Sequence, residues 1–234
     1  MRKSSTQTRT SGRPLGGESR FHGDTGSVIA EAALLTPLFI TLLFGVLEFG
    51  GAFRDYLTLG NGSLAGTRQA AIQGNAADAD WNIIQAVKKS VSAMPLSQIN
   101  KVVIFRLRPV LSNPGPGECL TSACPTSPVP STCLAAIQGV TTVCNVYGPT
   151  ELALASATVP ATWNTCPGPP SQTYPASFYC PTTRNVLAPS PTNSAGPDYV
   201  GVYVEITHPW ITGLFGSSIK MSDTSVTRLE PQKL

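Results

Sequence analysis

Charged residues are scarce in this chain. Asp, Glu, Lys and Arg together make up 12% of its 234 residues, about half the share that soluble domains usually carry. The charges are also unevenly placed, because the first 20 residues hold five Lys or Arg residues and a single acidic residue, Glu18. This composition does not indicate a densely charged, freely soluble enzyme.

Residue types that build catalytic and metal sites are also few. The chain has two histidines, His22 and His208, and no Cys-x-x-Cys pair, which argues against a histidine-dependent triad and against a zinc or redox site. It has no Gly-x-Ser-x-Gly turn, no phosphate-binding Gly-rich loop and no dinucleotide-binding fingerprint. We therefore expect no enzymatic activity, no metal and no cofactor, and we expect His208 to be a turn residue.

One long apolar segment dominates the N-terminal part of the chain. Residues 27–53 contain only two charged residues, Glu31 and Glu48, and the segment exceeds the roughly 20 residues that span a bilayer. The apolar run between the two glutamates is 16 residues long, whereas the core of a secretory signal peptide has about 7 to 15 residues. We therefore predict a retained transmembrane helix over residues 27–53, in contact with the lipid bilayer.

The basic residues predict the direction of this helix. Positively charged residues favour the cytoplasmic side of a membrane, and they are concentrated before residue 27. We expect residues 1–26 to be a disordered cytoplasmic leader of a single-pass protein of the cell membrane, with everything after the helix outside the cytoplasm. The same role accounts for the basic residues without a nucleic-acid partner.

The part outside the membrane is predicted to be an α+β domain. A helical stalk and a second helix are expected over residues 54–95, with a break near Gly74 and with Asp78 or Asp80 as the N-cap of the second helix. An apolar stripe on that helix is expected to face a sheet: Trp81, Ile84, Val87, Val91 and Met94. Three antiparallel strands are predicted within residues 96–234, at 102–107, 199–207 and 219–229.

A long insertion separates the first predicted strand from the other two. Residues 109–197 hold 16 of the 21 prolines and every cysteine, so we predict an irregular loop. An even number of cysteines outside the cytoplasm favours disulfides, each worth about 2 to 4 kcal/mol. The spacing leaves the pairing open among Cys119, Cys124, Cys133, Cys144, Cys166 and Cys180.

Three short motifs occur in order along and after the apolar segment: EAALLTP at 31–37, GVLEFG at 45–50 and GTRQAA at 66–71. Together they resemble the TadE/TadG-like family of tight-adherence (Flp) pilus assembly proteins, over residues 26–72 and more loosely over 199–231. The resemblance implies a pilin-like outer domain. It also implies helix packing and assembly roles for Glu31, Pro37, Glu48 and Arg68.

The start of the apolar segment also resembles a prepilin-type processing site, formed by Gly26, Ser27 and Glu31. The resemblance implies that a prepilin peptidase cuts between Gly26 and Ser27. The new amine would lie roughly 6 Å from Glu31 along a helix and could neutralise that carboxylate in its own or a neighbouring subunit. The alternative, an ordinary interfacial glutamate in an uncut anchor, stays open.

Two other residues of the apolar segment have simpler interpretations. Pro37 is expected to bend the helix without a chemical role. Glu48 is predicted to reach the outer interface, where solvation is favoured over an ion pair with Arg54.

The sequence therefore predicts a TadE-like minor pilin or pilus assembly protein. Its partners would be other pilin-like subunits and the pilus assembly platform. The alternative function is an unprocessed anchor that displays a disulfide-tied binding module. An extracytoplasmic enzyme that uses Asp198, Glu205 or Asp223 is the least favoured hypothesis.

Overall fold

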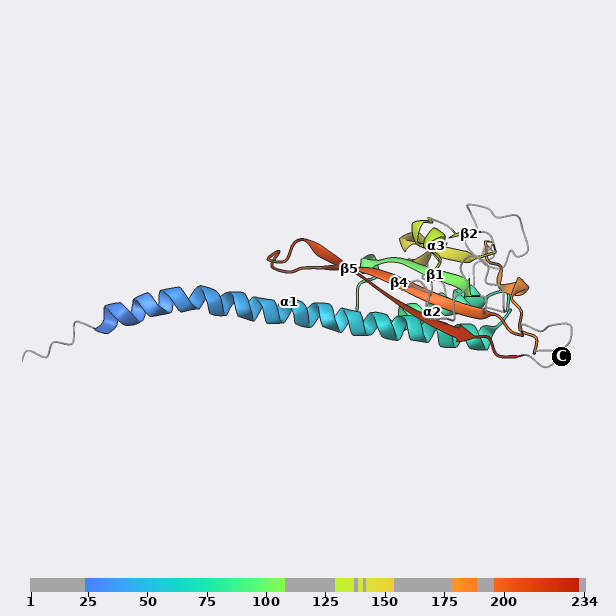
Figure 1. Ribbon diagram of the computed structural model, residues 1–234, viewed down its shortest axis with the longest axis horizontal. Helices are drawn as coiled ribbons and strands as arrows, with labels where there is room; N and C mark the ends of the chain where they lie inside the picture. The colour runs from blue at the N-terminus through green and yellow to red at the C-terminus, as the bar shows by residue number, and fades with distance from the viewer. Residues whose placement is uncertain are drawn as a thin grey trace, which may run out of the picture. The chain divides into compact units, whose positions relative to one another are not determined.

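The computed structural model describes most of the chain as two compact units. The described residues are 24–107, 129–136, 139–140, 142–153, 178–188 and 196–231. The first unit ends at Val46 and the second begins at Leu47. One helix, α1 (Asp24–Gln73), contributes residues to both units (Figure 1), so the boundary predicted at residue 53 is not a break in the helix.

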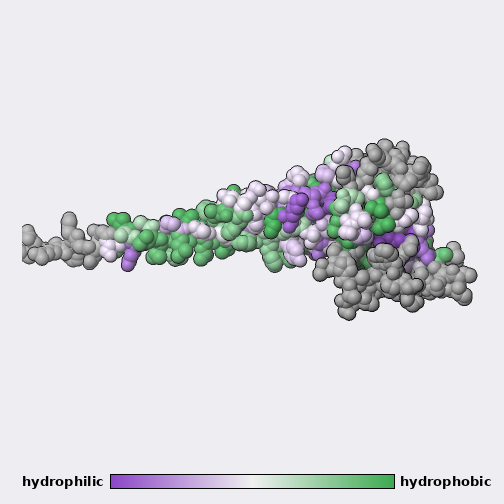
Figure 2. All heavy atoms as spheres, turned by 45° about the horizontal axis from the view of Figure 1, so that its top comes forward, coloured by the Kyte–Doolittle hydropathy of each residue, from purple (hydrophilic) through white to green (hydrophobic). Residues whose placement is uncertain are grey.

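The part of α1 in the first unit exposes apolar side chains all round. Leu34, Leu38, Phe39, Leu42 and Leu43 are between 59% and 79% exposed, and Figure 2 shows hydrophobic atoms along this stretch. Among the described residues, one helix, Ser27–Gln73, is long and apolar enough to cross a membrane. A helix that is hydrophobic on every side is stable when apolar surroundings cover it, so α1 is a candidate membrane anchor.

Two threonine hydroxyls in this stretch are hydrogen-bonded within the helix. Pro37 lies inside α1, and the hydroxyls of Thr36 and Thr41 donate to the carbonyls of Ala32 and Pro37 at 2.6 and 2.8 Å. Such local bonds leave these two hydroxyls without need of water, which suits a segment in lipid.

After Leu47, α1 continues to Gln73 and ends where the sequence predicts. Gly74 has a φ of 55°, in the left-handed region that glycine favours at helix C-termini. Its N–H donates to the Ala70 carbonyl at 3.0 Å, which closes the last turn.

Two glycines of α1 allow close packing of its neighbours. A Cβ at Gly62 would lie 2.6 Å from Val91, and a Cβ at Gly66 would lie 2.8 Å from Val87 and 3.0 Å from Val202. These glycines appear in the sequence only as weak helix formers, but in the structure the absence of a side chain lets α2 and the sheet approach α1.

Helix α2 (Ala79–Ser90) is shorter than predicted. The helix was predicted to run to Met94. Residues 91–94 instead form a turn in which the Met94 N–H donates to the Val91 carbonyl at 2.9 Å. Pro95 disfavours the helical conformation at the residue before it, so the helix ends early. The predicted apolar stripe is nevertheless buried in the core at all five positions.

Neither predicted aspartate caps α2 with its side chain. Asp78 occupies the N-cap position without a side-chain bond to the backbone, and its carboxylate accepts from the Asn82 amide at 2.9 Å. Asp80 lies in the first turn and is buried. The predicted N-cap position of Asp78 is therefore confirmed, but its carboxylate binds the Asn82 side chain in place of the backbone.

Within the described residues, five antiparallel strands form one sheet in the order β2-β3-β1-β4-β5 (Figure 1). The three predicted strands are present: β1 (Ile99–Leu107) and β4 (Tyr199–Pro209) are longer than predicted, and β5 (Ser218–Arg228) is shifted by one residue. Strands β4 and β5 form a hairpin paired from Tyr199↔Arg228 to Pro209↔Ser218. The predicted α+β architecture, a long apolar helix followed by an antiparallel sheet domain, is confirmed.

The insertion is more regular than predicted. It contributes β2 (Gly139–Val140), β3 (Cys144–Tyr147) and short helical elements: α3 (Ser131–Ala135), α4 (Pro149–Leu152) and η4 (Pro181–Thr183). A further short helix, η1 (Leu96–Gln98), precedes β1. Strand β3 is buried throughout and pairs with β1. A four-residue strand is too short to give a periodic signal, which is why the prediction of an irregular loop is wrong here.

The sheet has a core on each face. Val200, Val202, Val204 and Ile206 of β4 pack in the cluster that includes α2. Val103 and Phe105 of β1, with Val146 of β3, pack in a second cluster with α3. The two clusters follow from strand alternation, since successive side chains point to opposite faces.

A disulfide joins two described parts of the insertion. Cys133 of α3 is bonded to Cys144 of β3, with a Cα–Cα distance of 6.2 Å, and Cys180 is also in a disulfide. Cys119, Cys124 and Cys166 lie outside the described residues.

Two helical glycines make a matched pair for testing this packing. Nothing lies within 4 Å of a Cβ at Gly60, so Gly60→Ala should stabilise the helix by up to about 1 kcal/mol. Gly66→Ala should destabilise the domain by about 1 to 3 kcal/mol through overpacking. Urea unfolding of the full chain in detergent, followed by near-UV circular dichroism, measures both changes. Equal shifts in the two variants would contradict the close contact at Gly66.

Candidate functional site

The carboxylate of Glu48 lies between α1 and the turn that joins β4 to β5. Its side chain is 1% exposed. Its Oε2 accepts from the Ile211 N–H at 2.9 Å, and its Oε1 accepts from the Thr212 N–H and, at 2.7 Å, from the Thr212 hydroxyl. The predicted solvated glutamate is therefore wrong. Arg54, the alternative partner, donates instead to the Ala93 carbonyl at 2.8 Å.

The turn that receives Glu48 depends on two glycines. Gly213 and Gly216 have φ angles of 72° and 102°, which side chains strain and glycine tolerates. The chain reverses its direction at this turn. The Gly216 N–H donates to the Gly213 carbonyl at 3.3 Å, and the Trp210 N–H donates to the Ser217 carbonyl at 3.1 Å.

Aromatic rings pack around the same contact. The ring centroid of Phe49 lies 5.8 Å from that of Trp210 and 4.9 Å from that of Phe215. The ring centroids of Trp210 and Phe215 are 5.8 Å apart. His208 packs edge-on against Trp210 at 5.3 Å. Such ring pairs add to the apolar burial, so the carboxylate and the aromatic cluster hold the turn together.

A second polar contact lies seven residues further along α1. The Oδ2 of Asp55 lies 2.7 Å from the Nδ1 of His208, and both residues are buried. His208 is inside β4 and not in a turn, so that prediction is wrong. Neither Asp55 nor this histidine was predicted to be a site residue.

Further contacts continue along the hairpin. Ser63 donates to the Asp223 carboxylate, and the Thr67 hydroxyl donates to the Ser225 hydroxyl at 3.1 Å. The residues of α1 that face the sheet recur at three- or four-residue spacing: Glu48, Ala52, Asp55, Leu59, Ser63, Thr67 and Ala70. Helical spacing of this kind defines one face, and it is the signal from which the contacts could have been found.

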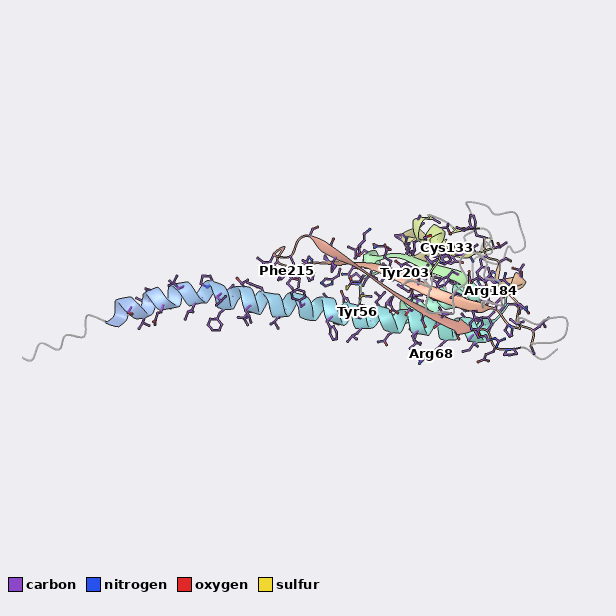
Figure 3. The ribbon with its side chains drawn as sticks, in the orientation of Figure 1. Tyr56, Arg68, Cys133, Arg184, Tyr203 and Phe215 are labelled. Carbon is purple, nitrogen blue, oxygen red and sulfur yellow. A yellow bond between two sulfur atoms is a disulfide. The ribbon has the colours of Figure 1, made fainter. Side chains whose placement is uncertain are left out.

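The other predicted site residues do not join this contact. Ser27, Glu31 and Pro37 lie in the first unit of α1 with exposed side chains, and Glu31 makes no hydrogen bond or ion pair with any described residue. Arg68 is exposed and points away from the sheet (Figure 3). Gly26 lies in the first turn of α1.

A separate buried network ties the insertion to α2. The Asp80 carboxylate accepts from Arg184 and, at 2.6 Å each, from the Asn145 amide and the Tyr147 hydroxyl. Burial, and then the nearby Asp80 carboxylate, raise the pKa of Tyr147 well above its ordinary value. Burial alone would lower the pKa of Arg184, but Asp80 raises it above its usual range. The Tyr147 hydroxyl therefore stays protonated and Arg184 stays charged, as a structural role requires.

The three acidic residues considered for an enzyme bind neighbouring side chains. Arg106 donates to Asp198 at 2.7 Å, the Tyr203 hydroxyl donates to Glu205 at 2.9 Å, and Ser63 donates to Asp223. Within the described residues no group of three or more His, Cys, Asp or Glu side chains is placed to hold a metal.

The described residues thus define a class: a candidate membrane anchor together with an α+β domain whose β4–β5 turn is bound to α1 through Glu48. Residues 26–68 match the model of the family described as TadE-like protein, so the resemblance that the motifs indicated is confirmed over this segment. The match includes Glu31, Pro37, Glu48 and Arg68. No curated protein and no solved structure matches the chain.

Substituting Glu48 should loosen the turn selectively. In Glu48→Ala, the amides of Ile211 and Thr212 lose their acceptors, so their hydrogen exchange should accelerate. Glu48→Gln keeps one acceptor oxygen, which should preserve protection at Thr212 better than at Ile211. Amide exchange of the full chain in detergent measures both.

Arg54→Ala is the matched control for that experiment. It removes a bond from the same helix to Ala93 and leaves the turn contacts in place. Unchanged exchange at residues 211 and 212 in Glu48→Ala, or equal acceleration in Arg54→Ala, would contradict the contact.

Proposed function

We propose that this protein is a membrane-anchored subunit of a tight-adherence pilus system, either a minor pilin or an assembly protein. One observation carries the proposal: the TadE-like match at residues 26–68 coincides with the exposed apolar stretch of α1 and with the helix face that binds the sheet. The family segment thus contains both the candidate anchor and the contacts that hold the outer domain.

The exposed face of α1 supports association with other pilin-like helices in the membrane. Leucine and phenylalanine side chains cover it, and the exposed Glu31 has no partner among the described residues. A charged side chain within a bilayer costs roughly 2.5 to 3.5 kcal/mol at its centre and less near its edge. A cation from a neighbouring subunit would remove this cost, so Glu31 favours assembly.

Processing before Ser27 would supply such a cation. We propose that a prepilin peptidase removes residues 1–26, which leaves the Ser27 α-amine about four residues, or roughly 6 Å along the helix, from Glu31. The basic residues of the leader favour its placement in the cytoplasm and the domain outside. The exposed terminus and carboxylate of adjacent subunits could then pair across a subunit contact.

Removing the Glu31 carboxylate should impair assembly without affecting the fold. Glu31→Ala should insert normally yet reduce the number of pili or the recovery of pilin partners, because the pair to a neighbouring subunit is lost. Glu31→Asp, which keeps the charge, should retain more assembly. Electron microscopy of cells and co-purification from membranes measure the two effects.

Thr36→Ala is the matched control, because it changes another exposed polar residue of the same helix whose hydroxyl bonds only within the helix. Normal piliation in Glu31→Ala, or an equal defect in Thr36→Ala, would argue against an assembly role for Glu31.

The second candidate is an uncut anchor that displays a binding module. The disulfide between Cys133 and Cys144 and the buried ion pair of Arg184 with Asp80 favour it, because they stabilise parts of the insertion that would display the module. No family match extends to those residues.

Intact mass of the protein purified from membranes separates the two candidates. The pilin proposal predicts loss of residues 1–26 and retention of the full leader when Gly26 is replaced by Ala. A full-length mass in the native chain, in a cell that assembles the pilus, would favour the uncut anchor.

A further inference from the structure

The tip of the β4–β5 hairpin exposes apolar side chains and has no charge. Ile211 is 85% exposed, Leu214 55% and Phe215 44%. No Asp, Glu, Lys or Arg occurs between Glu205 and Lys220. Turns that face water are usually polar, so this composition indicates a tip that is covered. Figure 3 shows Phe215 on this turn.

Most backbone amides of the tip donate hydrogen bonds within the protein. Between residues 210 and 216, five amides donate to protein acceptors: those of Trp210, Ile211, Thr212, Leu214 and Gly216. Two of them donate to the carboxylate of Glu48. Unpaired peptide groups are costly outside water, so pairing five of these seven amides within the protein lowers the cost of moving the turn out of water.

Glu48 also fixes the level of the turn along α1. At about 1.5 Å per residue, a hydrocarbon core about 30 Å thick that begins at Ser27 ends after about 20 residues, just before Glu48. Phe49 is 56% exposed and contacts the rings of Trp210 and Phe215. Aromatic residues are enriched at this interfacial level, so the turn is held where the helix would leave the hydrocarbon.

We propose that the β4–β5 turn, residues 210–217, is a second membrane contact whose exposed apolar side chains enter the outer lipid layer beside α1. The bilayer is the occupant because the turn is bound to the helix residues that adjoin the candidate span, which places lipid next to it. Attachment at a helix and a turn would restrict the height and tilt of the domain. This inference depends on the membrane span and is independent of the pilus role.

Photocrosslinking of the full chain in phosphatidylcholine and phosphatidylglycerol vesicles tests the proposal. The photoreactive residue p-benzoylphenylalanine replaces Phe215, Leu43 or Ile72 in separate variants. Leu43 lies in the apolar stretch, and Ile72 is 65% exposed but lies 24 residues beyond Glu48 on α1, about 36 Å along the helix. After irradiation, intact-protein mass spectrometry detects phospholipid adducts. We expect adducts at Phe215 and Leu43 and none at Ile72.

Each alternative result overturns the proposal in a distinguishable way. Labelling at Leu43 without labelling at Phe215 would mean that the span is in lipid and the turn is not. A protein dimer as the main product at Phe215 would assign the tip to a second copy of the chain. Absence of adducts at Leu43 as well would remove the span on which the inference depends. Adducts at Ile72 equal to those at Phe215 would show nonspecific labelling and remove the support.

Discussion

A buried carboxylate must find hydrogen-bond donors, and in this protein that requirement joins the helix to the sheet. Glu48 is buried between α1 and the β4–β5 turn, and the donors are the backbone and hydroxyl groups of Ile211 and Thr212. Loss of the carboxylate would leave the donors of Ile211 and Thr212 unpaired, and loss of these donors would leave a buried carboxylate unpaired. Both changes are costly. The position of the hairpin on the helix, and through it that of the sheet, therefore depends on this contact.

The same helix serves two environments because its surface changes near Leu47. Before that residue the side chains are apolar and exposed, with hydroxyls bonded inside the helix. After it, one face carries small and polar residues that bind the hairpin, including Asp55 to His208 and Thr67 to Ser225. Glycines at 62 and 66 let α2 and β4 approach this face. A single continuous helix can thus be both a candidate anchor and part of the core of the domain.

Much of this architecture could be predicted from the sequence because the signals were long. The 16-residue apolar run, the stripe on α2 and the alternation in β4 each repeat often enough to identify the element. The four-residue β3 and the end of α2 before Pro95 were missed because short strands and boundaries carry little periodicity. The role of Glu48 was missed for another reason: a lone glutamate at a helix end is compatible with water, and its donors lie more than 160 residues away in the chain. The Asp55–His208 pair required the same long-range information.

The central claim is that Glu48 and Thr212 act as one unit, and a double-mutant cycle tests it most directly. Unfolding midpoints of Glu48→Ala, Thr212→Val and the double variant would be measured in detergent for the full chain. Residues that share hydrogen bonds are non-additive in such cycles. The account predicts that the double variant loses less stability than the sum of the two single losses. Additive losses would contradict it, since they would mean that the Glu48 carboxylate and the Thr212 hydroxyl do not interact.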